Sequence, residues 1–403
     1  MPRTARRRGA GRRAPRIGLA LAGGGPVGAV YEVGALCALQ DALEGVDFTA
    51  LDIYVGVSSG AFVASMLANG FTPAELREIL VEAASSKHAV DHQVFLSPAL
   101  GELAQRTGAL PRLAFEMLWH RAREAVRARA RVPSPSAVSV GSAIPTGVFD
   151  NQRMARFLEQ AFRGEGRSND FRALGHRLRV IATDLDTSEA AEFGAPGLDR
   201  VPVSRAVQAS AALPLLYPPV EIGGRHYVDG ALRKTMHASV ALREGARLVF
   251  CINPIIPFHA GRAVRGRGAR DRIIDRGLPA ILSQSFRTLI YSRMETAMER
   301  YARQYPRASL LLFEPKRNEG EMFFTNVFND ADRHEVFARA YRATLREVSA
   351  RRGELARKLR PYGISIRRLA SHTPPPHPAR RSPAATAGLS RTLERLKHWV
   401  ERT

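Results

Sequence analysis

Cysteine is scarce in this sequence: its 403 residues include only Cys37 and Cys251. Both lie in apolar segments and look like small buried hydrophobic residues, which excludes a secreted fold held together by disulfides and favours a reducing compartment. No apolar run approaches the roughly 20 residues of a membrane-spanning helix. The arginine-rich first residues also lack the apolar core of a signal peptide. We therefore expect a cytoplasmic protein whose contact with membranes is at most peripheral.

Lysine is also rare, so arginine carries most of the formal net charge of +22. The basic side chains concentrate in residues 3–16, in residues 262–272 and in the carboxyl-terminal tail. Such a charge attracts anionic lipids or nucleic acids. Aromatic side chains do not interleave with the basic runs, as binding of a single nucleic-acid strand would require. We therefore expect peripheral contact with an anionic membrane surface rather than a nucleic-acid partner. No cluster in the sequence predicts a metal ion or another cofactor.

Glycine is plentiful by contrast, and the segment from Gly56 to Gly60 is the first place where it predicts chemistry. The segment follows the apolar run 51–55, which predicts a strand, and precedes the apolar run 61–67, which predicts a helix. A serine at the centre of such a sharp turn has a strained backbone and presents its hydroxyl at the carboxyl edge of the sheet. Flanking glycines leave room for the turn and for a substrate. The pattern predicts Ser58 as a nucleophile.

A second glycine cluster lies upstream. Gly23, Gly24 and Gly25 follow a strand predicted over 16–22 and precede a helix predicted over 26–43. Backbone amides of a glycine loop at a helix N-terminus form a partly positive hollow that suits an anion. For a serine nucleophile, the fitting anion is the oxyanion of a tetrahedral intermediate.

The same glycines allow a second interpretation. Gly23, Gly25 and Gly28 fit the dinucleotide-binding fingerprint, and Asp47 lies near the spacing expected of the acid that binds a ribose. However, that acid should end the second strand, whereas Asp47 precedes it. A nucleotide-binding protein is therefore the less favoured interpretation.

A third segment lies far downstream. Asp229 ends a short strand predicted over 225–228, and Gly230 after it predicts that the carboxylate lies on a turn. An isolated Asp-Gly is most often only a hairpin turn. A serine nucleophile needs a base within hydrogen-bonding reach, however, and Asp229 can supply one without a histidine.

A Ser-His-Asp triad is the nearest alternative, because His237 follows Asp229 in the chain order of α/β-hydrolases. His237 lies at the start of a helix predicted over 238–244, and His226 lies on the short predicted strand. We interpret both as ordinary, partly exposed histidines. A triad esterase, and a non-catalytic lipid- or nucleotide-binding protein that retains the motifs, remain open alternatives.

Taken together, these segments resemble the patatin-like phospholipase family in their order and spacing. The matching residues are Gly23, Gly24, Gly25 and Gly28 of the glycine loop, Gly56 to Gly60 of the serine turn, and Asp229 with Gly230. Segments 182–187 and 209–218 also look like parts of the family pattern. The resemblance implies a lipid acyl hydrolase with a Ser58–Asp229 dyad, an oxyanion loop at Gly23 to Gly25 and no cofactor. Its substrate would be a phospholipid or another acyl ester.

The chain departs from this family pattern at two points. Many members carry a basic residue between the third glycine and the later one, where this chain has Pro26 and Val27. If that cation holds a lipid phosphate, another arginine or lysine has to replace it here, so the headgroup stays open. Ala231 stands where a second glycine often follows the Asp-Gly, a change that leaves the dyad intact.

The remaining pattern predicts an α/β fold. Apolar strands alternate with helical segments, which implies three layers with a mainly parallel sheet between two layers of helices. The predicted strands are 16–22, 51–55, 177–183, 225–228, 247–252 and 309–313, and the predicted helices are 26–43, 60–69, 152–163, 238–244, 274–304 and 330–352. Such a sheet brings the glycine loop and the serine turn to its carboxyl edge.

Composition divides the chain into four parts. We expect a basic disordered tail over 1–15, an acyl hydrolase domain over 16–370, a proline-rich linker over 371–388 and a basic amphipathic helix over 389–403. Within the domain, residues 86–150 show a helical pattern with a basic face, typical of a cap that contacts lipid or of a helix packed on the sheet. The terminal amphipathic helix is a candidate membrane anchor.

Overall fold

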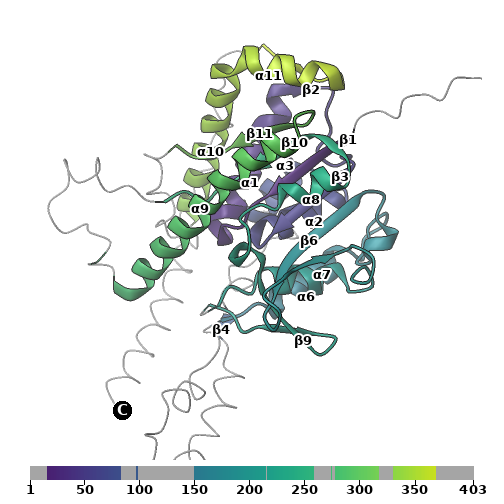
Figure 1. Cartoon of the computed structure of the whole chain (residues 1–403), viewed down its shortest axis with the longest axis vertical. Helices are drawn as coiled ribbons and strands as arrows, with labels where there is room; N and C mark the ends of the chain where they lie inside the picture. Colours follow the sequence, from purple (N-terminus) through teal and green to yellow (C-terminus); the bar gives the residue numbers. More distant parts are fainter. Residues whose placement is uncertain are drawn as a thin grey trace, which may run out of the picture.

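The computed structural model describes residues 16–82, 97–98, 149–214, 216–257, 274, 277–316 and 330–368. The expected tail, linker and terminal helix lie outside these residues, and so does the expected cap apart from residues 97–98 and 149–150. Figure 1 shows a central sheet flanked by helices, with α10 and α11 at one end of the molecule and α6, α7 and β9 at the other.

Parallel strands form the centre of this sheet. Their order is β11 (Ser309–Phe313), β10 (Ala246–Ile252), β1 (Arg16–Leu21), β3 (Ile53–Val57) and β6 (Arg177–Asp184). Most of their residues are buried, because helices cover both faces of a parallel sheet and leave no side for polar residues. The mainly parallel α/β architecture that the sequence predicts is confirmed.

Antiparallel strands complete the sheet. β7 (Ala190–Phe193) and β3 both pair with residues 180–181, so they lie on opposite edges of β6. β9 (Arg225–Asp229) pairs with residues 182–184 and shares two of these partners with β7, which places β9 on the same edge as β3. β9 therefore meets the end of β3 along one edge of β6. β8 (Val220–Ile222) pairs with β9.

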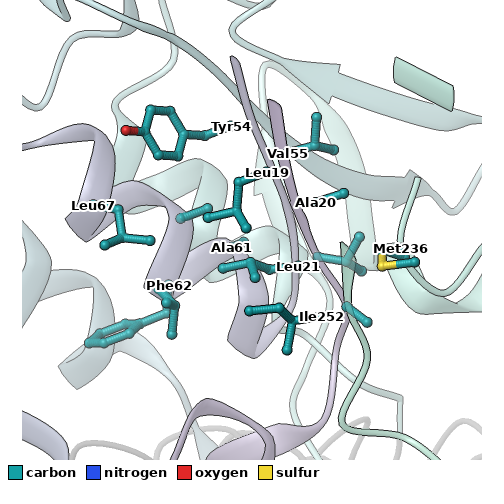
Figure 2. Packing of buried hydrophobic residues seen from close by; sticks show 14 of the residues in the cluster. Leu19, Ala20, Leu21, Tyr54, Val55, Ala61, Phe62, Leu67, Met236 and Ile252 are labelled. Carbon is teal, nitrogen blue, oxygen red and sulfur yellow. The ribbon is translucent and has the colours of Figure 1, made fainter. Parts of the chain in front are cut away.

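Helices cover both faces of the sheet. They are α1 (Gly25–Ala42), α2 (Ser59–Ala68), α3 (Pro73–Leu80), α6 (Gln152–Ala161), α7 (Val203–Ser210), α8 (Ala238–Arg243), α9 (Gly277–Gln304), α10 (Asp330–Ala350) and α11 (Arg352–Leu359). Figure 2 shows Leu21 on the side of β1 that Phe62 of α2 covers, with Met236 on the opposite side. A Cβ added to Gly18 would lie 3.3 Å from the Cβ of Ala241, so α8 packs on that opposite face. These contacts confirm the three-layer prediction.

The first helix, α1, is buried on most of its sides because α2, α3 and α10 surround it. Its contact with α10 depends on Gly34. A Cβ added there would lie 2.7 Å from the carbonyl oxygen of Phe337 and 2.8 Å from the Cβ of Ala340. The two helix backbones therefore approach as closely as the missing side chain permits.

Several details differ from the sequence prediction. The strand predicted over 51–55 lies at Ile53–Val57, so it extends into the glycine–serine motif. The helix predicted over 330–352 is α10, which ends at Ala350 before α11 begins. Cys37 is only partly buried, and its Sγ donates to the carbonyl oxygen of Pro73, whereas Cys251 is buried as expected.

Candidate active site

Ser58 lies between the last residue of β3 and the first residue of α2. Its backbone has φ 54° and ψ −121°, a conformation that residues other than glycine rarely adopt and that costs about 1–3 kcal/mol. Such strain persists only where the surrounding structure holds it. A serine in a strand-to-helix turn of this kind presents its hydroxyl beyond the carboxyl edge of the sheet.

Two glycines of the motif let α2 pack against the end of β1. A Cβ added to Gly60 would lie 2.6 Å from the carbonyl oxygens of Leu21 and Ala22, and one added to Gly56 would overlap the backbone of Ala61. Both positions are closer than real Cβ atoms approach. A side chain at either glycine would therefore push the serine turn away from the loop that follows Ala22.

Asp229 is the last residue of β9 and is only 2% exposed. The amide of Ala231 donates a hydrogen bond to its Oδ1 at 2.8 Å, and its own amide donates to the carbonyl oxygen of Ala212 at 3.0 Å. Burial raises the pKa of Asp229 to about 6, although hydrogen bonds from the Ala231 amide and the Ser58 side chain act in the opposite direction. This pKa suits a general base near neutral pH better than that of an ordinary aspartate.

The register of the sheet explains why the serine turn and the aspartate meet. β3 ends with Val57 opposite Ile181. On the same edge of β6, β9 ends with Asp229 opposite the next residue, Ala182. A Cβ added to Gly230 would touch the carbonyl oxygen of Ile181 and lie 3.3 Å from Cγ1 of Val57. The two strand ends therefore converge from opposite directions.

The glycine loop lies directly against the serine. A Cβ added to Gly23 would lie 3.1 Å from the Cβ of the serine, so a side chain there would crowd it. Gly25 has a φ of 63°, which favours glycine. Cβ atoms on Gly24 and Gly28 would lie 2.6 Å and 3.1 Å from Cγ of Pro254. Because the first amides of a helix lack an intrahelical acceptor, the start of α1 offers N–H groups and a positive dipole end beside the serine.

The prediction that both histidines are partly exposed is wrong for His237. His237 is buried, at 3% exposed, and not partly exposed, because α9 covers the turn that carries it. Its Nε2 lies 3.4 Å from the carbonyl oxygen of Gly230. Burial and then the neighbouring Lys234 lower the pKa of His237 to about 3, so the ring is neutral. The ring contacts the backbone beside Asp229, and His226 is exposed on β9.

Two residues near this pair lie in the segment 209–218 that resembles the family pattern, but the sequence prediction gave neither a role. Ser210, at the end of α7, accepts a hydrogen bond from the amide of Ser58 at 2.8 Å. Tyr217 is 8% exposed, and burial followed by the charge of Asp229 raises the pKa of its phenol. A polar residue within the mainly apolar run 209–213 was the available signal for Ser210. No sequence signal pointed to Tyr217, because its ring partner Phe149 comes from a distant segment.

The described ends of the expected cap lie beside these residues. β4 (Ser97–Pro98) pairs antiparallel with β5 (Phe149–Asp150). The amide of Phe149 donates to the carbonyl oxygen of Leu216 at 2.8 Å, and its ring centroid lies 6.5 Å from that of Tyr217. Since Tyr217 adjoins the candidate base, β5 and its partner β4 place residues 149–150 and 97–98 of that segment near the candidate site.

Asp47 lies at the opposite end of the sheet. It belongs to the loop before β3, where its Oδ1 accepts hydrogen bonds from the amide and hydroxyl of Thr49, both at 2.8 Å. Because β3 runs parallel to β1, that loop lies at the amino edge, whereas the glycine loop lies at the carboxyl edge. Asp47 is therefore too distant to bind the ribose of a nucleotide held by the glycine loop.

Two other features are absent from the part of the chain that the structure describes. No helix in that part combines the length and the hydrophobicity that a membrane span requires. No group of three or more His, Cys, Asp and Glu side chains there is arranged to hold a metal ion.

The family model of patatin-like phospholipases matches residues 19–242. The match covers more than half of the chain and includes the glycine loop, the serine turn and Asp229. The chain belongs to the patatin-like phospholipase family, a family of lipid acyl hydrolases. No curated protein matches the chain in sequence.

Solved structures with some similarity include VipD from Legionella pneumophila, with a TM-score of 0.39 and 14% identity over 83% of this chain and 67% of that chain. The type III effector ExoU, from Pseudomonas aeruginosa, gives a TM-score of 0.34 and 13% identity over 84% of this chain and 53% of that chain. Human GIVD cytosolic phospholipase A2, in complex with methyl gamma-linolenyl fluorophosphonate, gives 0.39 and 14% over 86% of this chain and 59% of that chain. This chain spans less than two thirds of the last two.

Proposed function

We propose that this protein hydrolyses acyl esters of lipids through an acyl-serine intermediate, with Ser58 as the nucleophile and Asp229 as the general base. One observation supports this most: a strained serine turn meets a buried carboxylate of raised pKa at the end of two strands. Membership of the family supports the substrate class, a phospholipid or another acyl ester.

In the first half-reaction, the hydroxyl of Ser58 attacks the ester carbonyl carbon while its proton passes to the carboxylate of Asp229. The amides of Gly24 and Gly25 bind the carbonyl oxygen as it becomes negative, a contribution typically worth about 3–4 kcal/mol per donor. The ester C–O bond then breaks, and Asp229 gives its proton to the leaving alcohol. The acyl group remains on Ser58.

In the second half-reaction, water attacks the acyl-serine. Asp229 accepts a proton from that water, the bond between Ser58 Oγ and the acyl carbon breaks, and Asp229 returns the proton to Ser58. The products are a free fatty acid and the original dyad, so water is the sole co-substrate of the cycle.

The surroundings of the site favour recognition of the acyl chain over the headgroup. Pro26 and Val27 in the first turn of α1 provide no cation for a lipid phosphate, and Val27 is buried. The partly buried Phe149 and the 41% exposed Leu216 supply apolar surface nearby. We therefore expect cleavage of both phospholipids and neutral lipid esters.

Labelling with a fluorophosphonate probe tests the nucleophile. The wild-type protein is expected to form a covalent adduct on Ser58, which mass spectrometry locates, and Ser58→Ala is expected to form none. Asp229→Asn should be labelled at least about 100-fold more slowly, because the base is lost. Release of fatty acid from a panel of phospholipids and neutral esters then defines the substrate.

Ser59→Ala and Asp186→Asn are the matched controls. Ser59 is adjacent to the nucleophile, and its Oγ has no hydrogen-bond partner among the described residues. Asp186 is an exposed aspartate on the turn after β6. Both variants should be labelled at the wild-type rate. A wild-type protein that is not labelled would contradict the proposal and favour a non-catalytic lipid-binding protein.

A further inference from the structure

The hydroxyl of Ser210 links the serine turn to the central sheet. Ser210 is fully buried at the end of α7. Its Oγ accepts a hydrogen bond from the amide of Ser58 at 2.8 Å and donates one to the carbonyl oxygen of Ile181 at 2.6 Å. A hydroxyl has one proton and two lone pairs, so donation to Ile181 leaves a lone pair for the amide. The side chain thus connects α7, β6 and the nucleophile turn.

The same segment also holds the candidate base. The carbonyl oxygen of Ala212 accepts a hydrogen bond from the amide of Asp229 at 3.0 Å. The hydroxyl of Thr183 donates to the carbonyl oxygen of Asp229, also at 3.0 Å. Residues 210–212 therefore contact the backbone of Ser58 through a side chain and that of Asp229 through a main-chain bond.

α7 is itself firmly anchored. Gln208, two positions before Ser210, exchanges two hydrogen bonds with Asn151: Nδ2 of Asn151 donates to the Gln208 carbonyl oxygen at 2.9 Å, and Nε2 of Gln208 donates to Oδ1 of Asn151 at 3.0 Å. Both side chains are buried. These bonds hold the end of α7, and with it the Ser210 hydroxyl, in place.

We infer that Ser210 is a positioning residue: its hydroxyl holds Ser58 in the strained turn and at a constant separation from Asp229. This inference rests on the proposed function of Ser58 and Asp229. A positive φ persists only where neighbours over-determine the backbone, and the bond to Ser210 is one such constraint. Without the hydroxyl, the buried amide of Ser58 loses its acceptor and the turn can relax towards an ordinary conformation.

The bond also limits which amides can bind the oxyanion. The amide of Ser58 is already used by Ser210 and points towards α7. It therefore cannot contribute to the oxyanion hole without breaking that bond. This leaves the task to other donors, and the glycine loop at the start of α1 lies against the serine.

Ser210→Ala and Ser210→Cys test the inference, since a thiol has a similar shape but is a poor acceptor. Both variants should react with a fluorophosphonate about 10- to 100-fold more slowly than wild type, because small misplacements of reacting groups have effects of this size. On a soluble ester, kcat should fall similarly while KM changes by less than about threefold. Ser210→Thr, which keeps the hydroxyl, should recover part of the rate.

The pH profile separates positioning from a loss of stability. A hydrogen bond from Ser58 holds the pKa of Asp229 below the value that burial alone would give. If Ser58 is displaced, this bond weakens, and the acid limb of the profile moves to higher pH in Ser210→Ala. Among the described neighbours, Tyr217 stays neutral because its pKa is raised, and His237 stays neutral because its pKa is about 3.

Ser65→Ala is the matched control. Ser65 is fully buried in α2, the helix that follows the turn, and its hydroxyl donates to the carbonyl oxygen of Phe62 at 2.8 Å. Its loss should lower the unfolding temperature but leave the labelling rate and the acid limb unchanged. A wild-type rate and limb in Ser210→Ala, or an equal loss of rate in Ser65→Ala, would overturn the positioning role. A wild-type protein that is not labelled would overturn the proposed function and this inference together.

Discussion

At the scale of single residues, folding stability and the proposed catalysis place opposite demands on the protonation state of Asp229. Folding raises its pKa from 3.8 to about 6, since burial favours the neutral acid. For such a group, the contribution to stability is fully present below the unfolded pKa and is lost as the pH rises through about 6. Glu32, fully buried in α1 without a hydrogen-bond partner among the described residues, has a raised pKa and acts in the same direction. The proposed catalysis requires the opposite, because in that mechanism only ionised Asp229 can accept the proton of Ser58.

We therefore expect activity and stability to depend on pH in opposite directions. The kcat/KM for a soluble ester should fall tenfold per pH unit below about 6 and level off above it. Asp229→Asn lacks the buried charge and should be more stable than wild type at pH 8, by up to about 3 kcal/mol. Near pH 4 this difference should be much smaller. Activity profiles and urea unfolding at both pH values measure these effects, and a stability difference independent of pH would contradict the assignment of the raised pKa to Asp229.

Local sequence signals explain which parts of the candidate site could be predicted. Ser58 and the glycines of the upstream loop lie in short motifs whose neighbours in sequence are also their neighbours in space. Asp229 was predicted from its motif, although its burial was not visible in the sequence. Ser210 contacts Ser58 from a distant segment, and His237 is buried because α9 covers its turn. A local pattern can mark Ser210 as an unusual polar residue, but it does not encode which distant residues meet in the fold.

At the scale of secondary structure, apolar runs predicted the parallel strands well, because strands covered on both faces have almost no polar positions. An apolar run does not indicate whether a strand pairs parallel or antiparallel with its neighbour, so the antiparallel pairing of β9 was not predicted. The short helix α7, which packs against β6 and α6, was not predicted, although Val203, Ala206 and Val207 recur at helical spacing. The start of α3 had a usable signal: Thr72 and Glu75 form a capping box, with Pro73 between them.

Gly34 provides a test at this scale, because it sets the distance between α1 and α10. Gly34→Ala should lower the free energy of unfolding by about 1–3 kcal/mol, since the new Cβ collides with backbone and not with a flexible side-chain end. Gly353→Ala in the first turn of α11, where an added Cβ meets nothing within 4 Å, should instead stabilise by up to about 1 kcal/mol. Urea unfolding measures both. Labelling of Ser58 in the folded fraction should stay unchanged. If Gly34→Ala and Gly353→Ala changed the free energy of unfolding equally, Gly34 would not limit the distance between α1 and α10.

At the scale of the whole molecule, the net charge of +22 is the dominant property. Within the described residues, many arginines are paired with carboxylates, as Arg179 is with Glu244 at 2.5 Å and Arg351 is with Glu347 at 3.0 Å. Positive charge also concentrates in the terminal segments, which lie outside the described residues. We propose that these segments supply attraction to anionic membranes, while the described fold supplies the chemistry. The two functions are then separable.

A chain that ends at residue 372 tests this separation. Residues 373–403 contain six Lys and Arg and two Asp and Glu, and each basic residue near an anionic surface contributes about 1 kcal/mol. The shortened chain should therefore bind vesicles that contain phosphatidylserine about 10- to 100-fold more weakly at low salt, with a smaller difference at high salt. It should cleave a soluble ester at the wild-type rate, since Ser58 and Asp229 lie within the described fold.

Replacing the leucines at 389, 393 and 396 with glutamine in the full-length chain distinguishes charge from apolar insertion. This variant keeps every charge but loses the apolar face of the expected helix. If the helix inserts, the variant should bind as weakly as the shortened chain at high salt, where the attraction between charges is screened; if charge alone attracts, it should bind like wild type. If the shortened chain bound vesicles as tightly as wild type, the proposal that the carboxyl-terminal segment is a membrane anchor would be contradicted. Attraction to the membrane would then have to come from residues that precede 373.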